Sequence, residues 1–120
     1  MSNKMKGVLR GFGYAFNGIS YLIRTGRNFK IQLIAFCIVC LAGFYFNITS
    51  FEWLMILGFS ALVLSLEALN TSIEELCDLY STQRNDKIKT IKDITAGAVL
   101  IASIFSAIVG VFIFWKYVYV

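Results

Sequence analysis

The chain contains no histidine and no proline, and only 15% of its 120 residues are charged. Without histidine it lacks the commonest general base of enzymes, so any proton transfer must fall to another side chain. The absence of proline, of low-complexity tracts and of linkers favours one domain over residues 1–120. So little charge is unable to cover a water-soluble globule, and 58% of the residues are hydrophobic, against about 45–50% in soluble domains. The composition therefore indicates a membrane protein.

Cysteine is also scarce, with three residues in the whole chain. Cys37 and Cys40 form a C-x-x-C inside an apolar stretch, but a zinc site is not expected without histidine or a second cysteine pair. We interpret the cysteines as small apolar packing residues. The first 28 residues are basic and contain no apolar run that fits a cleavable signal sequence, so we expect the membrane spans to be retained.

Four helical segments follow from the spacing and length of the apolar stretches. In residues 4–24 the apolar side chains recur on one side, which predicts an amphipathic helix lying on the membrane surface. A membrane span needs about 20 mainly apolar residues, and we place three spans near 30–48, 51–69 and 94–115. The second span reaches this length only by including Glu67. The sequence thus predicts an all-α integral membrane protein with a surface helix and three transmembrane helices.

Basic residues predict the orientation of these spans. Lysine and arginine are concentrated before residue 30 and in the loop 82–93, whereas the turn 47–52 has neither. The positive-inside rule then places the N-terminus and the loop in the cytoplasm. In the last span Ala98, Ala102, Ser106 and Gly110 form a stripe of small residues, which suits close packing within the chain at least as well as a subunit interface.

A polar stripe interrupts the second span where "EALNTSIEELCD" begins. Glu67, Asn70 and Glu74 follow at steps of three and four, so they share one helix face. A carboxylate near hydrocarbon is costly, and we interpret this stripe as functional. For Glu75 and Asp78 we expect only that the helix leaves the membrane and is solvated. A channel or transporter is disfavoured because the polar groups cluster at one end of the spans rather than along them.

The same stretch, followed after a short basic loop by "IKDITAGAVLIA", closely resembles the prokaryotic diacylglycerol kinase family, which includes undecaprenol kinases. "GYAFNGISYLIRTGRNFKIQL" resembles the surface helix and first span of that family, so the resemblance covers nearly the whole chain. It implies a multi-pass lipid kinase of the bacterial cytoplasmic membrane, built as a homotrimeric bundle with active sites shared between subunits. No nucleic-acid partner is expected. The chain has no P-loop, so phosphoryl transfer must use a different scaffold.

The resemblance also implies a reaction and catalytic roles. The γ-phosphoryl of ATP, bound with Mg²⁺, would pass to the hydroxyl of a membrane lipid, either diacylglycerol or undecaprenol. Glu67 matches the family's candidate general base, and Asn70 matches a residue that orients this site. Glu74 matches a Mg²⁺ ligand at the ATP phosphates, in keeping with the preference of Mg²⁺ for hard oxygen ligands.

Three more residues match nucleotide-binding positions of the family. Lys92 and Asp93 match a Lys-Asp pair near the nucleotide, where the lysine supplies positive charge to the phosphates. Tyr14 matches an aromatic residue near the adenine. These assignments rest on the resemblance and not on the spacing of the residues.

Two departures from the family pattern bear on activity. Gly26 stands where the family has a glutamate that resembles a second metal ligand, so the alternative is an impaired or non-catalytic member that serves as a nucleotide-binding or assembly module. Restoring that glutamate should lower the magnesium requirement, unless Gln32 or Asn28 already substitutes for it or position 26 needs a positive φ. In the loop, "STQRNDK" replaces the usual acidic-Tyr-His pattern, and Gln83 and Asn85 are the candidate substitute contacts.

Overall fold

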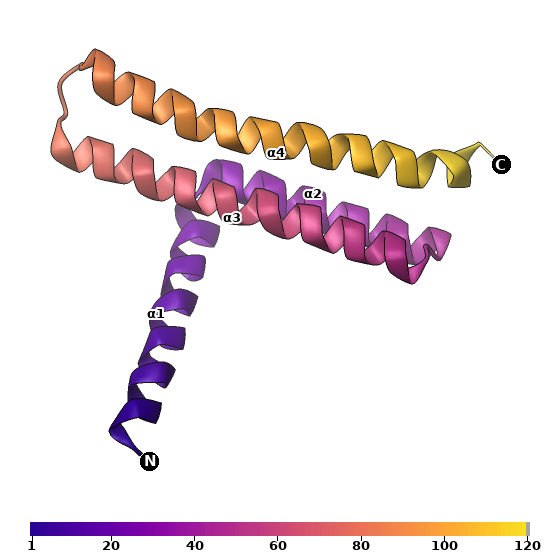
Figure 1. Cartoon of the computed structure of the whole chain (residues 1–120), viewed down its shortest axis with the longest axis horizontal. Coiled ribbons are helices and arrows are strands. Elements are labelled where there is room, and N and C mark those ends of the chain that lie inside the picture. Colours follow the sequence, from indigo (N-terminus) through magenta and orange to yellow (C-terminus); the bar gives the residue numbers. More distant parts are fainter. Residues whose placement is uncertain (120) are drawn as a thin grey trace.

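A computed structural model describes residues 1–119 as four helices with short connections (Figure 1). They are α1 (Asn3–Thr25), α2 (Arg27–Phe46), α3 (Ser50–Tyr80) and α4 (Asp86–Val118). The last three are long and apolar enough to cross a membrane. The predicted all-α class, with one N-terminal helix followed by three membrane-grade helices, is confirmed.

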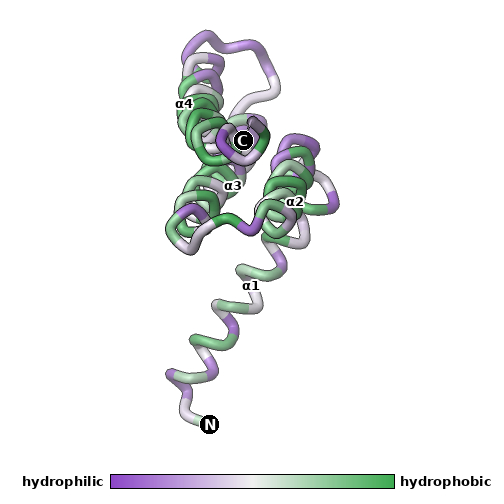
Figure 2. The backbone as a smooth tube through the Cα atoms, turned by 90° about the vertical axis from the view of Figure 1, so that its right-hand side faces the viewer, coloured by the Kyte–Doolittle hydropathy of each residue, from purple (hydrophilic) through white to green (hydrophobic). Residues whose placement is uncertain are grey.

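The three long helices form a bundle in which α2 and α4 both pack on α3 (Figure 2). We call the end with the α2–α3 connection the turn end, and the end with the α3–α4 loop the loop end. Many large apolar side chains point outward, and Phe112 is 78% exposed. Such a surface is unfavourable in water but suits hydrocarbon, because lipid tails are as apolar as the side chains. The bundle therefore has the surface of a membrane-spanning unit.

The turn end is closed by a tight connection. Asn47 ends α2 with a left-handed φ of 52°, a conformation that asparagine tolerates better than most residues. Thr49 and Glu52 form a capping box at the start of α3, with N–H···O distances of 3.2 and 2.9 Å. A Cβ atom at Gly43 would lie 2.8 Å from the ring of Trp53, so only glycine lets these helices approach here.

Glu52 also joins α3 to α4. The residue is 7% exposed, and its carboxylate accepts a hydrogen bond of 2.6 Å from the Tyr117 hydroxyl and lies 2.8 Å from the Lys116 Nζ. The Tyr117 ring lies 5.8 Å from that of Phe46 on α2. One buried carboxylate and its partners therefore hold the turn ends of all three helices together.

The first helix leaves the bundle at the loop end and extends away from it (Figure 1). No residue of α1 is buried, and its apolar side chains, such as Phe12 and Phe16, are exposed. The helix covers the predicted segment 4–24, and its unpartnered apolar face suits a membrane surface.

The small-residue stripe of α4 faces the interior of the bundle. Ala102 is buried, and Ser106 and Gly110 line a cavity of about 220 Å³ between α2, α3 and α4. Packing within the chain therefore accounts for this part of the stripe.

Candidate active site

The polar stripe on α3 lies on the inner face of that helix. Glu67 and Asn70 are 3% and 4% exposed, whereas Glu74, one turn nearer the loop, is only partly buried. The Asn70 amide donates a hydrogen bond of 3.2 Å to Glu74 Oε1. The hydroxyl of Thr71 donates to the Glu67 carbonyl oxygen at 3.1 Å. The structure thus brings together the two predicted catalytic residues and the predicted metal ligand.

These three side chains share a pocket of about 370 Å³ formed by α2, α3 and α4. The pocket is lined by Asn28, Ile31, Gln32, Glu67, Asn70, Glu74, Ala96, Val99, Leu100 and Ser103. Within residues 1–119, the Asn70 Oδ1 atom is buried without a hydrogen-bond partner, and no lysine or arginine forms an ion pair with Glu67. Buried polar groups normally have partners, so a ligand hydroxyl is well suited to this pocket.

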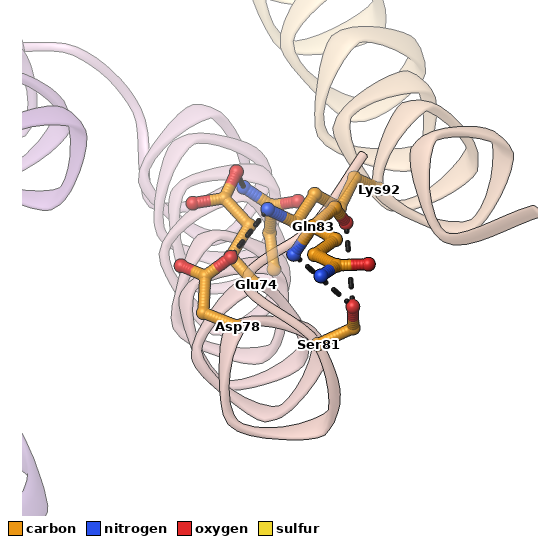
Figure 3. A network of polar contacts seen from close by, with 6 residues as sticks. Glu74, Asp78, Ser81, Gln83 and Lys92 are labelled. Carbon is orange, nitrogen blue, oxygen red and sulfur yellow. Dashed lines mark hydrogen bonds and ion pairs between the residues drawn. The ribbon is translucent and has the colours of Figure 1, made fainter. Parts of the chain in front are cut away.

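Lys92 lies beside Glu74 at the loop end of the stripe (Figure 3). Its Nζ atom is 2.6 Å from Asp78 Oδ1. Asp78, predicted only to be a solvated residue, is indeed exposed but also holds the lysine in place. The structure therefore adds one cation to the acidic group on α3.

Asp93 and Tyr14 lie outside this group in the single chain. Asp93 forms an exposed ion pair of 2.7 Å with Lys89, one turn earlier on α4, because neighbouring helix residues point in different directions. Tyr14 is 71% exposed in the middle of α1, which extends away from the bundle (Figure 1). Their predicted nucleotide roles remain predictions.

A second pocket of about 530 Å³ lies under the α3–α4 loop and reaches Lys92. Its lining includes Gln83, Asn85 and a further cation, Arg84. The Asn85 side-chain oxygen caps α4 by accepting from the Lys87 and Ile88 N–H groups, at 2.9 and 3.2 Å, so it is committed to the fold. Gln83 keeps its side chain available. Arg84 was predicted only as one of the basic residues that orient the chain in the membrane, and its place in this pocket comes from the structure.

One contact ties α1 to the end of α3. The Tyr21 hydroxyl donates a hydrogen bond of 2.6 Å to Glu75 Oε1. This bond raises the pKa of Tyr21 above its ordinary value, because ionisation would break it and place two negative charges together. The sequence carried no signal for this pair, whose members are far apart along the chain.

Gly26 forms the corner between α1 and α2. Its φ and ψ are −82° and 101°, so the positive φ considered as an alternative is not needed. A Cβ atom would nevertheless lie 2.8 Å from the Leu22 carbonyl oxygen and 3.2 Å from the Phe29 Cβ. Any side chain at position 26 must therefore shift the backbone at this corner.

The residues of the stripe offer oxygen ligands for Mg²⁺, but few of them. Residues 1–119 hold no cluster of three or more acidic, histidine or cysteine side chains suited to a metal. Glu74 supplies a carboxylate and Asn70 an unpartnered amide oxygen. This set fits Mg²⁺, which commonly takes one or two carboxylates and completes its shell with phosphates and water.

Comparison with known proteins shows the family of this chain. The family model for prokaryotic diacylglycerol kinase matches residues 13–114. The chain is 36% identical over 112 residues to an undecaprenol kinase from Bacillus subtilis, covering 93% of this chain and 91% of the relative. It is 38% identical over 104 residues to a diacylglycerol kinase from Synechocystis, covering 86% and 59%. It is 22% identical over 120 residues to a diacylglycerol kinase from Escherichia coli, covering 98% of each.

The family match extends over most of the bundle and includes the whole polar stripe of α3. The relatives from Bacillus subtilis and Synechocystis are both more than 30% identical over most of this chain. The chain therefore belongs to the prokaryotic diacylglycerol kinase family of ATP-dependent membrane lipid kinases.

Proposed function

We propose that this protein transfers the γ-phosphoryl of MgATP to the hydroxyl of a membrane lipid, diacylglycerol or undecaprenol, at the loop end of the bundle. The observation that carries the proposal is the buried pair Glu67 and Asn70. They line one pocket, where Glu67 has no cationic partner and Asn70 Oδ1 has no hydrogen-bond partner among the described residues. A hydroxyl entering from the membrane would donate its proton to Glu67, which leaves the Asn70 oxygen for the metal.

Glu67 acts as the general base. The lipid hydroxyl gives its proton to the Glu67 carboxylate while its oxygen bonds to the γ-phosphorus, and the bond from that phosphorus to the bridging oxygen of ADP breaks. General-base assistance contributes about 10²–10⁴-fold to rate. Asn70, one turn from the base, orients Glu74 through the hydrogen bond that its amide donates.

Phosphoryl transfer depends mainly on positioning and on neutralising charge. Lys92 supplies positive charge beside Glu74 and is aimed by Asp78. Glu74 and the Asn70 amide oxygen would hold Mg²⁺, which supplies further charge neutralisation when bound. No ligand shell beyond these residues is needed for a metal that arrives with ATP.

The remaining nucleotide contacts belong to the proposed homotrimer. Tyr14 and Asp93 lie outside the cluster of their own chain, which supports a site completed by a neighbouring subunit. The basic residues at the loop end support a cytoplasmic N-terminus in the bacterial inner membrane. Cross-linking in mild detergent should give trimers, and exclusively monomeric protein would argue against shared sites.

The rival proposal, a non-catalytic relative, is favoured by one observation, the absence of a carboxylate at Gly26. Incubating the purified protein with MgATP and each lipid in mixed micelles decides between them. We expect one lipid to be phosphorylated. ATP binding without phosphorylation of either lipid would favour the non-catalytic module.

A further inference from the structure

Two polar side chains with no role in the proposed mechanism lie in the Glu67 pocket. They are Ser103 on α4 and Gln32 on α2. The Ser103 hydroxyl is buried and has no hydrogen-bond partner among the described residues. A serine within an apolar helix usually donates to the carbonyl four residues earlier. Ser103 makes no such bond, so its donor is free for another partner.

Both side chains sit close to the proposed reacting hydroxyl. Asp78 on α3 and Lys92 on α4 form an ion pair, so they lie at the same level of the bundle. Glu67 precedes Asp78 by as many residues as Ser103 follows Lys92. Because the two helices are antiparallel, Glu67 and Ser103 also lie at the same level. Gln32 is one turn along α2 from Asn28, about 6 Å towards the turn end. Both residues also line the next cavity, of about 220 Å³, between the same helices.

We propose that Ser103 and Gln32 form a second subsite, which binds the ester carbonyl of a glycerolipid next to its reacting hydroxyl. The inference rests on the proposed function. A serine hydroxyl and a glutamine amide are both hydrogen-bond donors. In a diacylglycerol the sn-2 ester begins on the carbon beside the one that bears the hydroxyl, whereas a polyprenol has no acceptor besides its hydroxyl. A buried donor left unpaired is costly, so this subsite favours the ester lipid.

The next cavity offers a path for an acyl chain below the ester. Its walls include Ala35, Phe36, Val63 and Ala107, which are apolar. The polar subsite therefore lies between the reacting hydroxyl and a mainly apolar cavity, which also contains Ser60 and Ser106, in the order of the groups along a diacylglycerol.

The test compares a diacylglycerol with the dialkylglycerol of the same chains, in which ethers replace the esters and the hydroxyl is kept. We expect kcat/KM of the wild-type protein to favour the diester about tenfold, as two neutral hydrogen bonds would supply. Ser103→Ala removes one of these two bonds and should lower the ratio to about threefold while leaving turnover of the diether unchanged. Ser65→Ala, on the exposed side of α3, is the matched control and should keep the wild-type ratio.

A second measurement does not depend on turnover. In micelles, the diester should raise the thermal midpoint of the wild-type protein more than the diether does, and Ser103→Ala should reduce this difference. Equal ratios in wild type and Ser103→Ala, or phosphorylation of undecaprenol in preference to both glycerolipids, would overturn the subsite. If the diester is bound selectively but no lipid is phosphorylated, the subsite stands and the kinase proposal falls.

Discussion

The two ends of the bundle each bury a glutamate of α3, and the two are treated differently. At the turn end, Glu52 contacts the Thr49 N–H, the Tyr117 hydroxyl and the Lys116 ammonium group within 2.6–2.9 Å. At the loop end, Glu67 is more deeply buried but has no cationic partner among the described residues.

This difference separates a carboxylate that stabilises the fold from one available for chemistry. Partners offset the cost of removing Glu52 from water. Glu67 has no ion pair among the described residues, and we propose that a carboxylate placed in this way at membrane depth serves the reaction. Burial alone therefore does not distinguish the two glutamates, whereas the presence or absence of a cationic partner does.

The largest effect is expected at Glu67. Glu67→Gln keeps the size of the side chain and removes its ability to accept the proton, so lipid phosphorylation should fall by about 10²–10⁴-fold. ATP binding and the thermal midpoint should remain close to wild type. Turnover near the wild-type value would remove Glu67 from the mechanism.

Glu52→Ala should show the opposite behaviour. It leaves the Tyr117 hydroxyl and the Lys116 ammonium group without their partner and opens the capping box, so we expect a loss of about 1–3 kcal/mol in free energy of unfolding. Activity per folded molecule should change little. Denaturant titration and a kinase assay on the same samples measure both quantities. A large loss of activity at unchanged stability would contradict the structural role.

Two glycines sharpen the contrast between the ends. Gly43→Ala pushes against the Trp53 ring at the turn end and should lower the free energy of unfolding by about 1–3 kcal/mol without changing kcat.

Gly26→Ala pushes against the Leu22 carbonyl oxygen at the loop end and should lower kcat several-fold. Gly97→Ala, where a Cβ atom has nothing within 4 Å, is the control. Equal effects of Gly26→Ala and Gly97→Ala on kcat would show that the corner does not set the site.

The effect of a carboxylate at position 26 is measured by comparing Gly26→Glu with Gly26→Ala. Gly26→Glu carries the same backbone strain as Gly26→Ala but adds a possible metal ligand. We expect it to reach half-maximal rate at a magnesium concentration a few-fold lower than Gly26→Ala. Titrations of both variants and the wild type give the comparison. If the two variants require the same magnesium concentration, the missing glutamate does not limit this site.

The smallest effect is expected at the contact between α1 and α3. Tyr21→Phe removes the hydrogen bond to Glu75, so trypsin should cut at Arg24 and Arg27 a few-fold faster while the bundle stays intact. Because the pKa of Tyr21 is raised, the bond contributes fully below its ordinary pKa of about 10 and is lost as the pH rises through the raised value. Cleavage at an unchanged rate would mean that the bond does not hold α1.

The sequence by itself determined the helical class, the order of one N-terminal helix and three longer apolar helices, and the stripe of Glu67, Asn70 and Glu74. All of these depend on the spacing of residues within one helix, and an α-helix places positions three and four apart on the same face whatever surrounds it. The resemblance to the family rests on the same local motifs.

The tertiary structure alone decided which residues of different helices meet. Lys92 forms an ion pair with Asp78, while its neighbour Asp93 pairs with Lys89. Glu52 contacts Tyr117 at the end of α4, and Ser103 lines the same pocket as Glu67. These pairings depend on the rotation and offset of one helix against another. Helical periodicity leaves both undetermined, because they are set by how side chains on facing helices interlock.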